Sequence, residues 1–487
     1  MILRIRNLIN NELLGAIEGR TLDNIEPATG ARYGTIPASN DQDIERAIVA
    51  ARSAFPQWSI TPPEQRAALL NRLADLVEEN LDEFAMLESR DNGKPVRLAR
   101  TVDIPRAVTN LRFFAAAATQ FASESHSLPG AGINYTLRQP LGPVACISPW
   151  NLPLYLFSWK IAPALAAGNT VVGKPSEVTP ASAYLFSQMV IEAGFPPGVL
   201  NIVHGDGHAA GAPLVTDERI KAVSFTGGTG TGAWIAEALA PSFKKISLEL
   251  GGKNPTIVFA DADYDRALAG SLSSAFSNQG QICLCGSRIY VQSGIYERFR
   301  ADFVARTRQL VLGDPLEAST DQGALVSEAH MNKVLRHIQI AHDEGGKLLT
   351  GGERVMLSGR CEHGYFVMPT VFEDLALSCR TTQEEIFGPV VTLTPFDDEA
   401  EALKHANGTQ YGLAASVWSS NLDRCHRMAA ELDFGIVWIN CWLLRDLRTP
   451  FGGMKASGLG REGGFEAMHF FTEAKNICIA VQQNDDE

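Results

Sequence analysis

Apolar side chains between about residues 41 and 120 repeat at the three- and four-residue spacing of amphipathic helices. The first run covers positions 44–55 behind an N-cap-like Asp41, and the second covers 69–77 behind Pro62 and Pro63. The pattern predicts that this segment is helical.

The pattern changes after residue 140 to short apolar runs that alternate with stretches of helical character. Continuous apolar runs of this length are typical of parallel strands buried on both faces, and a spacing of roughly 25 to 30 residues fits βαβ units. A second alternating series follows Gly251, so we expect an α/β fold with parallel sheets. The apolar runs occupy 143–147, 170–173, 200–203, 222–225 and 256–259.

Composition excludes several classes of protein. The chain has 487 residues, and hydrophobic residues make up 45% and charged residues 20%, which excludes a mostly disordered protein. A formal net charge of −13 argues against a binder of nucleic acid or of anionic membranes, because such binding depends on clustered Lys and Arg.

The cysteine spacing and the apolar segments indicate in which cellular compartment the protein is expected. The eight cysteines have no regular spacing, which indicates reduced thiols and a cytoplasmic protein. The N-terminus carries Arg4 and Arg6 and lacks the pattern of a signal peptide. Positions 139–159 carry no charge, but four prolines make a lipid-exposed helix untenable there, so we predict no membrane span.

Two glycine-rich segments follow apolar runs, at 204–211 and 225–232. Glycines between a strand and a helix let backbone N–H groups approach a pyrophosphate, although either segment alone can be a plain βα turn. A third run ends in Lys174-Pro-Ser-Glu177, where a carboxylate could accept both ribose hydroxyls and repel a 2′-phosphate. The alternative for this third segment is a solvated turn.

Cys283 is the candidate nucleophile. It follows the glycine-containing stretch 278–282 and is expected to lead into a helix, whose N-terminus could stabilise a thiolate. Cys283 and Cys285 are not accompanied by a second cysteine pair or by a histidine at zinc-ligand spacing, so a zinc site is not expected. The alternative is an inert core cysteine.

Two polar residues at the ends of apolar runs complete the candidate chemistry. Glu249 could act as a general base if burial raised its pKa, or it could be an ion-pair partner. Asn151 lies between Pro149 and Pro153, and its amide could donate to an oxyanion or only satisfy its own turn.

These segments occur in the order found in the NAD(P)-dependent aldehyde dehydrogenase superfamily, which the chain resembles from about residue 20 to 480. The shared motifs include LELGGKNP, NQGQIC, PWN, KPSE, FTG and EEIFGP. The resemblance implies that Cys283 attacks an aldehyde and that Asn151 and the Cys283 N–H hold the oxyanion. It also implies that Glu249 activates the water that hydrolyses the resulting thioester.

The resemblance further implies NAD as the cofactor, in a variant Rossmann domain. Glu177 would favour NAD over NADP, and Gly228 departs from the small hydroxyl residue that many members have there. The implied cofactor-binding residues are Ile147, Ser148, Trp150, Lys174, Ser176, Glu177, Gly207, Gly211, Phe225, Thr226, Gly227, Gly228, Leu250, Glu385 and Phe387.

A narrower resemblance connects the segments 103–106, 278–285 and 441–448 with the 2-aminomuconic and 2-hydroxymuconic semialdehyde dehydrogenases of aromatic-ring breakdown. Their substrate is a conjugated aldehyde with a carboxylate. By this similarity, Arg106 and Arg445 are candidates to bind the carboxylate, and the alternative is that both form ordinary ion pairs.

The resemblance also implies the domain organisation and partners. We expect an NAD-binding domain from 1–120 and 142–250, a catalytic domain from 251–437, and bridging segments at 121–141 and 438–487 that join subunits into a homodimer or homotetramer. No metal is expected. The competing functions are a CoA-acylating dehydrogenase, a cysteine hydrolase or amidase, and a structural protein that kept only the fold.

Overall fold

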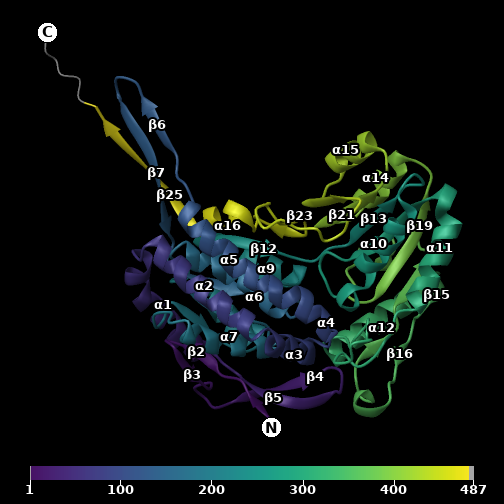
Figure 1. Ribbon diagram of the computed structural model, residues 1–487, viewed down its shortest axis with the longest axis horizontal. Coiled ribbons are helices and arrows are strands. Elements are labelled where there is room, and N and C mark those ends of the chain that lie inside the picture. The colour runs from purple at the N-terminus through teal and green to yellow at the C-terminus, as the bar shows by residue number, and fades with distance from the viewer. Residues whose placement is uncertain (1, 482–487) are drawn as a thin grey trace.

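Two mainly parallel sheets, each covered by helices, form the body of the molecule, and a narrow three-stranded sheet projects from it (Figure 1). This computed structural model describes residues 2–481. The predicted α/β fold is confirmed.

The first sheet has the strand order β24-β12-β11-β8-β9-β10-β2-β3. Its five central strands are parallel, so their carboxyl ends lie along one edge of the sheet. The parallel strands are β8 (Pro143–Ile147), β9 (Thr170–Lys174), β10 (Leu200–Ile202), β11 (Ala222–Thr226) and β12 (Lys245–Glu249). Antiparallel strands complete the edges, namely β2 (Asn7–Ile9), β3 (Glu12–Leu14) and β24 (Gly458–Leu459).

Helices cover both faces of this sheet. One apolar cluster includes Val144 and Val171 and lies under α2, α5, α6 and α7, whereas the neighbouring Ala145 and Val172 belong to a second cluster under α1, α8 and α9. The helices are α1 (Asp41–Ser59), α2 (Pro63–Glu79), α3 (Leu81–Asn92), α4 (Val96–Leu98), α5 (Ile104–Gln120), α6 (Pro153–Ala166), α7 (Ala181–Glu192), α8 (Ala212–Thr216) and α9 (Thr229–Leu239).

The helical prediction for residues 41–120 is confirmed, with one difference at its start. The N-cap is Asn40 and not Asp41, because the Asn40 side chain accepts hydrogen bonds from the backbone N–H groups of Gln42 and Asp43. The Asp43 carboxylate accepts the Asn40 N–H in return, which forms a capping box.

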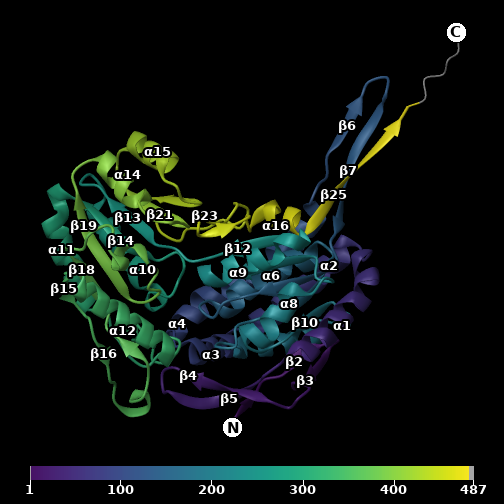
Figure 2. The ribbon, with the colours of Figure 1, turned by 180° about the vertical axis from the view of Figure 1, so that it is seen from behind.

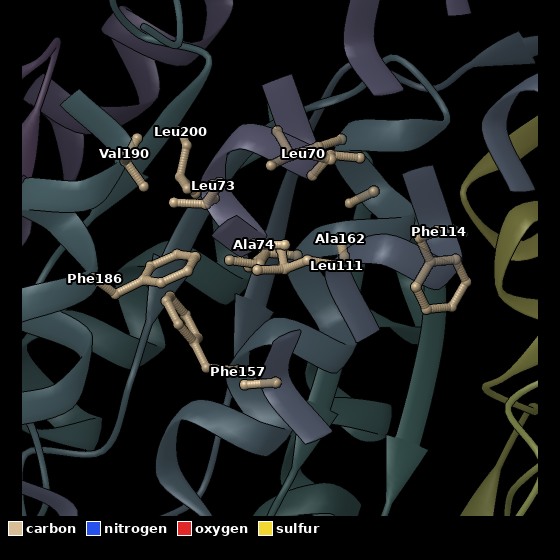
Figure 3. Close-up of a cluster of buried hydrophobic side chains, with 14 of the residues drawn as sticks. Leu70, Leu73, Ala74, Leu111, Phe114, Phe157, Ala162, Phe186, Val190 and Leu200 are labelled. Carbon is tan, nitrogen blue, oxygen red and sulfur yellow. The ribbon is translucent and has the colours of Figure 1, made fainter. Parts of the chain in front are cut away.

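The core of this part is shown in Figure 3, where side chains from α2, α5, α6 and α7 meet. Leu73, Leu111, Phe157 and Phe186 are fully buried in it. The aromatic rings of Phe157 and Phe186 meet edge to face, with their centroids 6.3 Å apart. This packing fixes α6, whose N-terminus carries one wall of the site described below.

The second sheet has the order β15-β18-β19-β14-β13-β21-β22, parallel except for β15. Helices α10 and α11 cover one face and α14 and α15 the other, since Val258 and Ile257 point into opposite clusters. The strands are β13 (Asn254–Val258), β14 (Gly286–Gln292), β15 (Lys347–Thr350), β18 (Thr370–Glu373), β19 (Val390–Phe396), β21 (Ala414–Trp418) and β22 (Ile436–Ile439). The helices are α10 (Tyr264–Phe276), α11 (Ser293–Arg308), α12 (Glu328–Asp343), α13 (Arg380–Gln383), α14 (Glu399–Asn407) and α15 (Leu422–Glu431).

The projecting sheet joins segments far apart in the sequence. Strands β6 (Ser125–Leu128), β7 (Gly132–Pro140) and β25 (Thr472–Ala480) form it, and both views show it standing clear of the body (Figures 1 and 2). The connection from β22 back to it passes through β23 (Met454–Lys455), β24 and α16 (Gly464–Phe470). Smaller sheets pair β1 (Leu3–Arg4), β4 (Thr21–Glu26) and β5 (Ala31–Pro37), β16 (Arg354–Val355) with β17 (Phe366–Val367), and β20 (Tyr411–Gly412) with β23.

All eight cysteines have free thiols. Over residues 2–481, no helix has the length and apolar character needed to cross a bilayer, and no group of three or more His, Cys, Asp and Glu side chains could hold a metal ion.

The buried core predicts a large effect of truncating one of its side chains. We expect Leu73→Ala to lower the free energy of unfolding by about 2–5 kcal/mol, because it opens a cavity among fully buried side chains. Val49→Ala on α1, at a side chain that is 47% exposed, should change it by less than about 0.5 kcal/mol. Urea denaturation of both variants measures the difference, and equal effects would show that the cluster is loosely packed.

Candidate active site

A cavity of about 240 Å³ lies at the carboxyl edge of the first sheet, against the second part of the molecule. The sequence predicted every lining residue except Pro149, Gly251, His330 and Lys333. The lining consists of Pro149, Trp150, Asn151, Thr226, Gly227, Gly228, Leu250, Gly251, Cys283, His330, Lys333, Glu385 and Phe387.

Cys283 lies in a loop that leads into a strand. The sequence predicted a helix after it, and this prediction is wrong, because the loop runs directly into β14 between β13 and β19. The Ile-Tyr-Val run of β14 is β-branched and aromatic, which favours a strand. The Asn254 side chain fixes the loop by donating to the carbonyls of Cys283 (2.7 Å) and Cys285 (3.0 Å).

The turn before Cys283 has an unusual backbone. Asn278, Gln279 and Gly280 all have positive φ, at 51°, 56° and 70°. Two such non-glycine residues cost of order 1–3 kcal/mol each, so the surroundings must hold them. The Gln279 side chain donates to the Ala324 carbonyl at 2.8 Å, and a Cβ at position 280 would meet the Gly388 carbonyl oxygen at 2.2 Å. The glycine of the Asn-Gln-Gly sequence is therefore required because the backbone at Gly388 approaches the turn closely.

Asn151 is buried just before α6, and both its side chain and its backbone are hydrogen-bonded to this turn. Its side-chain amide donates to the Gln281 carbonyl at 3.0 Å, and its backbone carbonyl accepts from the Asn278 side-chain amide at 3.1 Å. The Asn151 carbonyl also accepts from the buried Lys94 ammonium at 3.0 Å, and Lys94 is ion-paired to Asp103. The side chain thus reaches across to the cysteine loop and does not merely satisfy its own turn.

The electrostatics of Cys283 contradict the expected stabilised thiolate. Burial raises the pKa of the Cys283 thiol above its ordinary value, and the carboxyl groups of Glu249 and Glu385 raise it further. Arg445 opposes these effects only in part. The segment after Cys283 is the strand β14 and not a helix, so the expected helix N-terminus is not there to stabilise a thiolate.

Glu249 is the last residue of β12 and is only 4% exposed. Burial raises its pKa well above the ordinary value, and Glu462 adds to the shift while Lys160, Arg461 and Arg445 oppose it. Neither carboxyl oxygen has a hydrogen-bond partner within the described chain, so the alternative of an ion-pair partner is not supported. A buried carboxyl group with free lone pairs is suited to general-base chemistry.

Glu385 and Phe387 close the cavity from the second part. Glu385 accepts the Gly252 N–H at 2.8 Å, and its carboxylate packs directly against Gly251, where a Cβ would lie 2.2 Å from Glu385 Oε2. Phe387 has a φ of 61°, and its ring lies edge to face with Trp150 at 5.2 Å.

His330 and Lys333, on the first turns of α12, are the two titratable cavity residues that sequence reasoning missed. The His330 Nε2 bonds the Phe387 carbonyl at 2.7 Å, so this nitrogen carries the proton. Burial lowers the pKa of His330 to about 4, so the ring is neutral. Lys333 donates to the Glu385 carbonyl at 3.3 Å. No motif surrounds either residue, and only the fold brings them to the site.

A second group of predicted residues lies beyond the cavity, at the ends of β8 and β9. Lys174 and Glu177 face each other at 3.2 Å, and the Ser148 N–H donates to the Lys174 carbonyl. Ile147 pairs with Lys174 in the sheet, and a Cβ on Gly211 would lie 3.6 Å from the Lys174 side chain. Gly207 begins the helical turn that contains Gly211, and the Ser176 hydroxyl accepts the Val178 N–H.

The glycine-rich segment at 225–232 turns from β11 into α9, with Gly228 as the N-cap. The Gly227 N–H donates to the Glu249 carbonyl at 3.0 Å, which ties this turn to the end of β12. A Cβ at Gly228 would meet nothing within 4 Å, so the missing hydroxyl residue leaves open space beside the helix N-terminus.

Arg106 and Arg445 are brought together by Tyr155. Arg445 donates to the Tyr155 hydroxyl at 2.9 Å, and the guanidinium carbon of Arg106 lies 5.8 Å from the centre of the Tyr155 ring. Arg445 also stacks on Phe451 at 4.0 Å. The two arginines differ from most others in the described chain, because neither has a carboxylate within ion-pair distance there.

Comparisons with known proteins show which family and which fold the chain resembles. A family model described as the aldehyde dehydrogenase family matches residues 16–477. A 2-aminomuconic semialdehyde dehydrogenase of Mus musculus is 48% identical, with 98% of each chain covered. A 2-hydroxymuconic semialdehyde dehydrogenase of Pseudomonas sp. (strain CF600) is 44% identical, with 98% of this chain and 99% of that one covered. The NAD⁺ complex of an aldehyde dehydrogenase from Bacillus cereus has a TM-score of 0.96 at 41% identity, covering 98% of this chain and 97% of that one.

The raised pKa of Cys283 predicts slow alkylation at neutral pH. Only the thiolate reacts, and each unit of increase in pKa lowers the thiolate fraction about tenfold. We expect iodoacetamide to modify Cys283 more slowly than the exposed Cys478 at pH 7, and the Cys283 rate to keep rising above pH 9. Mass spectrometry of the two peptides from one sample measures both rates. Faster alkylation of Cys283 at pH 7 would show that the resting protein holds a thiolate.

Proposed function

The chain belongs to the aldehyde dehydrogenase family, and from this we propose that it oxidises an aldehyde to a carboxylic acid with NAD through a thioester on Cys283. The observation that carries the proposal is the cavity in which Cys283, Asn151 and Glu385 meet beside the Gly227–Gly228 turn.

Cys283 supplies the nucleophile in this proposal. Its sulfur attacks the aldehyde carbon, and the carbonyl oxygen becomes the oxyanion of a thiohemiacetal. The Asn151 amide, already aimed at the cysteine loop, and the Cys283 N–H stabilise that oxyanion. Because the pKa of the thiol is raised at rest, a base must take its proton, and the Glu249 carboxylate is near enough to influence that pKa.

Glu249 acts again after oxidation. The thioester must be hydrolysed, and a water activated by Glu249 attacks it, releasing the acid and returning the thiol. Its unpartnered oxygens leave this carboxyl group free for both roles. An acyl transfer to CoA would not need such a base, so this feature favours hydrolysis.

The residues of the site fit NAD. Oxidation of the thiohemiacetal requires the loss of a hydride, and bound NAD would supply the hydride acceptor. Two buried hydroxyl groups without partners in the described chain, on Ser148 and Thr226, lie on strand ends that face the cofactor side. Lys174 and Glu177 would hold the adenosine ribose, and Glu385 the nicotinamide ribose, with Phe387 and Trp150 shaping the wall. Glu177 would disfavour a 2′-phosphate.

A carboxylate-bearing semialdehyde is the proposed substrate. Both compared relatives carry a muconic semialdehyde in their names. In this chain, Arg106 and Arg445 flank Tyr155 without neutralising partners among the described residues, which suits a substrate carboxylate. The proposed reaction is therefore the oxidation of a 2-aminomuconic or 2-hydroxymuconic semialdehyde.

We propose that the projecting sheet joins copies of the chain into a homodimer or homotetramer. Leu128, Ile133, Leu137 and Ile479 are each at least 40% exposed on it, and a neighbouring subunit would cover them. The eight free thiols suit a reducing compartment, so we propose the cytoplasm. The expected domain division near residue 250 stays a proposal.

Replacing the base should separate the two half-reactions. We expect Glu249→Gln to give one burst of NADH per active site at high pH, followed by turnover lowered by about 10²–10⁴-fold. In the natural protein the deacylation rate should rise with pH through the raised pKa of Glu249, and the variant should lose this rise. Stopped-flow absorbance at several pH values measures both. Unchanged steady-state turnover would remove Glu249 from the mechanism, and Cys283→Ala should show no burst at all.

The arginine pair predicts a selective loss. We expect Arg445→Ala to raise KM for a carboxylated semialdehyde far more than for a neutral aldehyde, because a desolvated charge-assisted pair contributes roughly 2–5 kcal/mol. Arg448→Ala is the matched control, since Arg448 is exposed and paired with Asp446 at 2.6 Å. Steady-state kinetics with both substrates decide, and equal effects of Arg445→Ala on the two would exclude the carboxylate role.

A further inference from the structure

The segment 440–445, which ends in Arg445, has an unusual backbone held at several points. Asn440 and Leu443 have positive φ, at 53° and 61°, which is costly for a bulky residue such as Leu. The Asn440 side chain is bonded twice to the backbone of Ser419, at 3.0 and 2.9 Å. Such a conformation persists only where the surroundings fix it.

Two tryptophan indoles hold the rest of the segment. The Trp438 N–H donates to the Leu444 carbonyl at 2.8 Å and closes the loop on itself. The Trp442 N–H donates to the Leu284 carbonyl at 3.0 Å, one residue after Cys283. This second bond connects the arginine-bearing segment directly to the cysteine loop.

The tip of the segment is fixed as well. Arg445 donates to the Tyr155 hydroxyl and stacks on Phe451, so its guanidinium is held at the end of its long side chain. Cys283 is fixed from the other side, because its carbonyl accepts the Asn254 amide at 2.7 Å. With both ends restrained, the hydrogen bond from Trp442 to the Leu284 carbonyl joins the two loops directly and sets their separation.

We propose that Trp442 is a specificity-determining positioning residue that sets the distance between Arg445 and the Cys283 sulfur, so that the enzyme selects aldehydes by the spacing between carboxylate and aldehyde carbon. This inference rests on the proposed binding of a substrate carboxylate by Arg445. Trp442 itself need not touch the substrate.

The physical reason is that attack requires the carbonyl carbon within a narrow range of the sulfur. A displacement of about 1 Å can lower the rate by about 10²-fold. A substrate one methylene too short or too long cannot satisfy a rigid arginine and a rigid sulfur together. A neutral aldehyde is held only by apolar contacts, so it does not have to reach Arg445 and the Cys283 sulfur at the same time.

The apolar packing of the loop alone does not account for these features. Trp442 and Leu443 are half-buried beside a cluster that includes Leu284 and Phe451, and packing would be served by any large apolar side chain. An indole N–H aimed at a specific carbonyl and a leucine held at positive φ add directional restraint, which packing does not require.

The test is a series of straight-chain ω-oxocarboxylates that differ by single methylenes, assayed with NAD beside neutral aldehydes of matched length. We expect the natural protein to show a clear optimum in kcat/KM along the series. Trp442→Phe keeps the ring and removes the donor, and it should lower the ratio between the best and the neighbouring lengths by roughly two- to tenfold, the range for one net hydrogen bond. Activity with neutral aldehydes should stay within about twofold of the natural protein.

Two further variants complete the test. Leu444→Ala, at a side chain that is 74% exposed, keeps its carbonyl and should leave the length optimum unchanged. Leu443→Gly tolerates the positive φ and frees the loop while leaving the Trp442 donor, so it should broaden the optimum as well. This variant also decides the question if Trp442→Phe does not fold.

The outcomes separate the two proposals. An unchanged length optimum in Trp442→Phe overturns the role of Trp442, and Leu443→Gly decides in its place if Trp442→Phe does not fold. This holds even if Arg445→Ala abolishes the preference for a carboxylate. An equal loss for neutral and carboxylated aldehydes also overturns it, because the bond would then serve only the cysteine loop. A natural protein with no carboxylate preference contradicts the proposed function itself.

Discussion

The hydrogen-bonded junction between Asn151 and the turn at 278–281 is the constraint on which the site depends. It joins the start of α6, in the first part of the molecule, to the loop that carries Cys283 in the second. Each side is locally strained or buried, so neither would hold its geometry alone. The turn has three consecutive positive φ angles, and the Asn151 carbonyl is bonded to a fully buried lysine. The amide of Asn151, the proposed oxyanion donor, and the Cys283 sulfur are thereby held in fixed positions relative to each other.

Burial dominates the electrostatics of the same site. The pKa of Cys283 and that of Glu249 are both raised chiefly by desolvation, which disfavours the charged form of each group. Arg445, Arg461 and Lys160 oppose the shift of Glu249, but none of them forms a direct ion pair with it in the described chain. In the proposed reaction, the Cys283 sulfur therefore becomes a nucleophile after its proton is transferred to a base.

Much of this architecture could be predicted from the sequence. Fully buried parallel strands produce continuous apolar runs, and β8, β9, β10 and β11 all coincide with such runs. The carboxyl ends of parallel strands share an edge, so residues far apart, such as Lys174 and Glu249, are expected on one side of the sheet. The fate of the chain after Cys283 could not be predicted locally, because the strand β14 depends on pairing with β13 and β19. His330 and Lys333 could not be found either, since they reach the cavity only through the docking of α12.

The segment around Arg445 extends this lesson from folding to specificity. Its residues have no regular periodicity, yet two indoles and one asparagine determine its path through bonds to carbonyls 6 to 158 positions away. The proposed reaction requires a fixed nucleophile and a fixed oxyanion donor, and the hydrogen bonds between Asn151 and the turn at 278–281 would hold both. Selection among aldehydes requires a second fixed point at a set distance from the first. The strained loop 440–445, bonded to the residue after Cys283, would provide this second point. The free-energy cost of ordering the loop is incurred during folding, so it is not incurred again when the substrate binds.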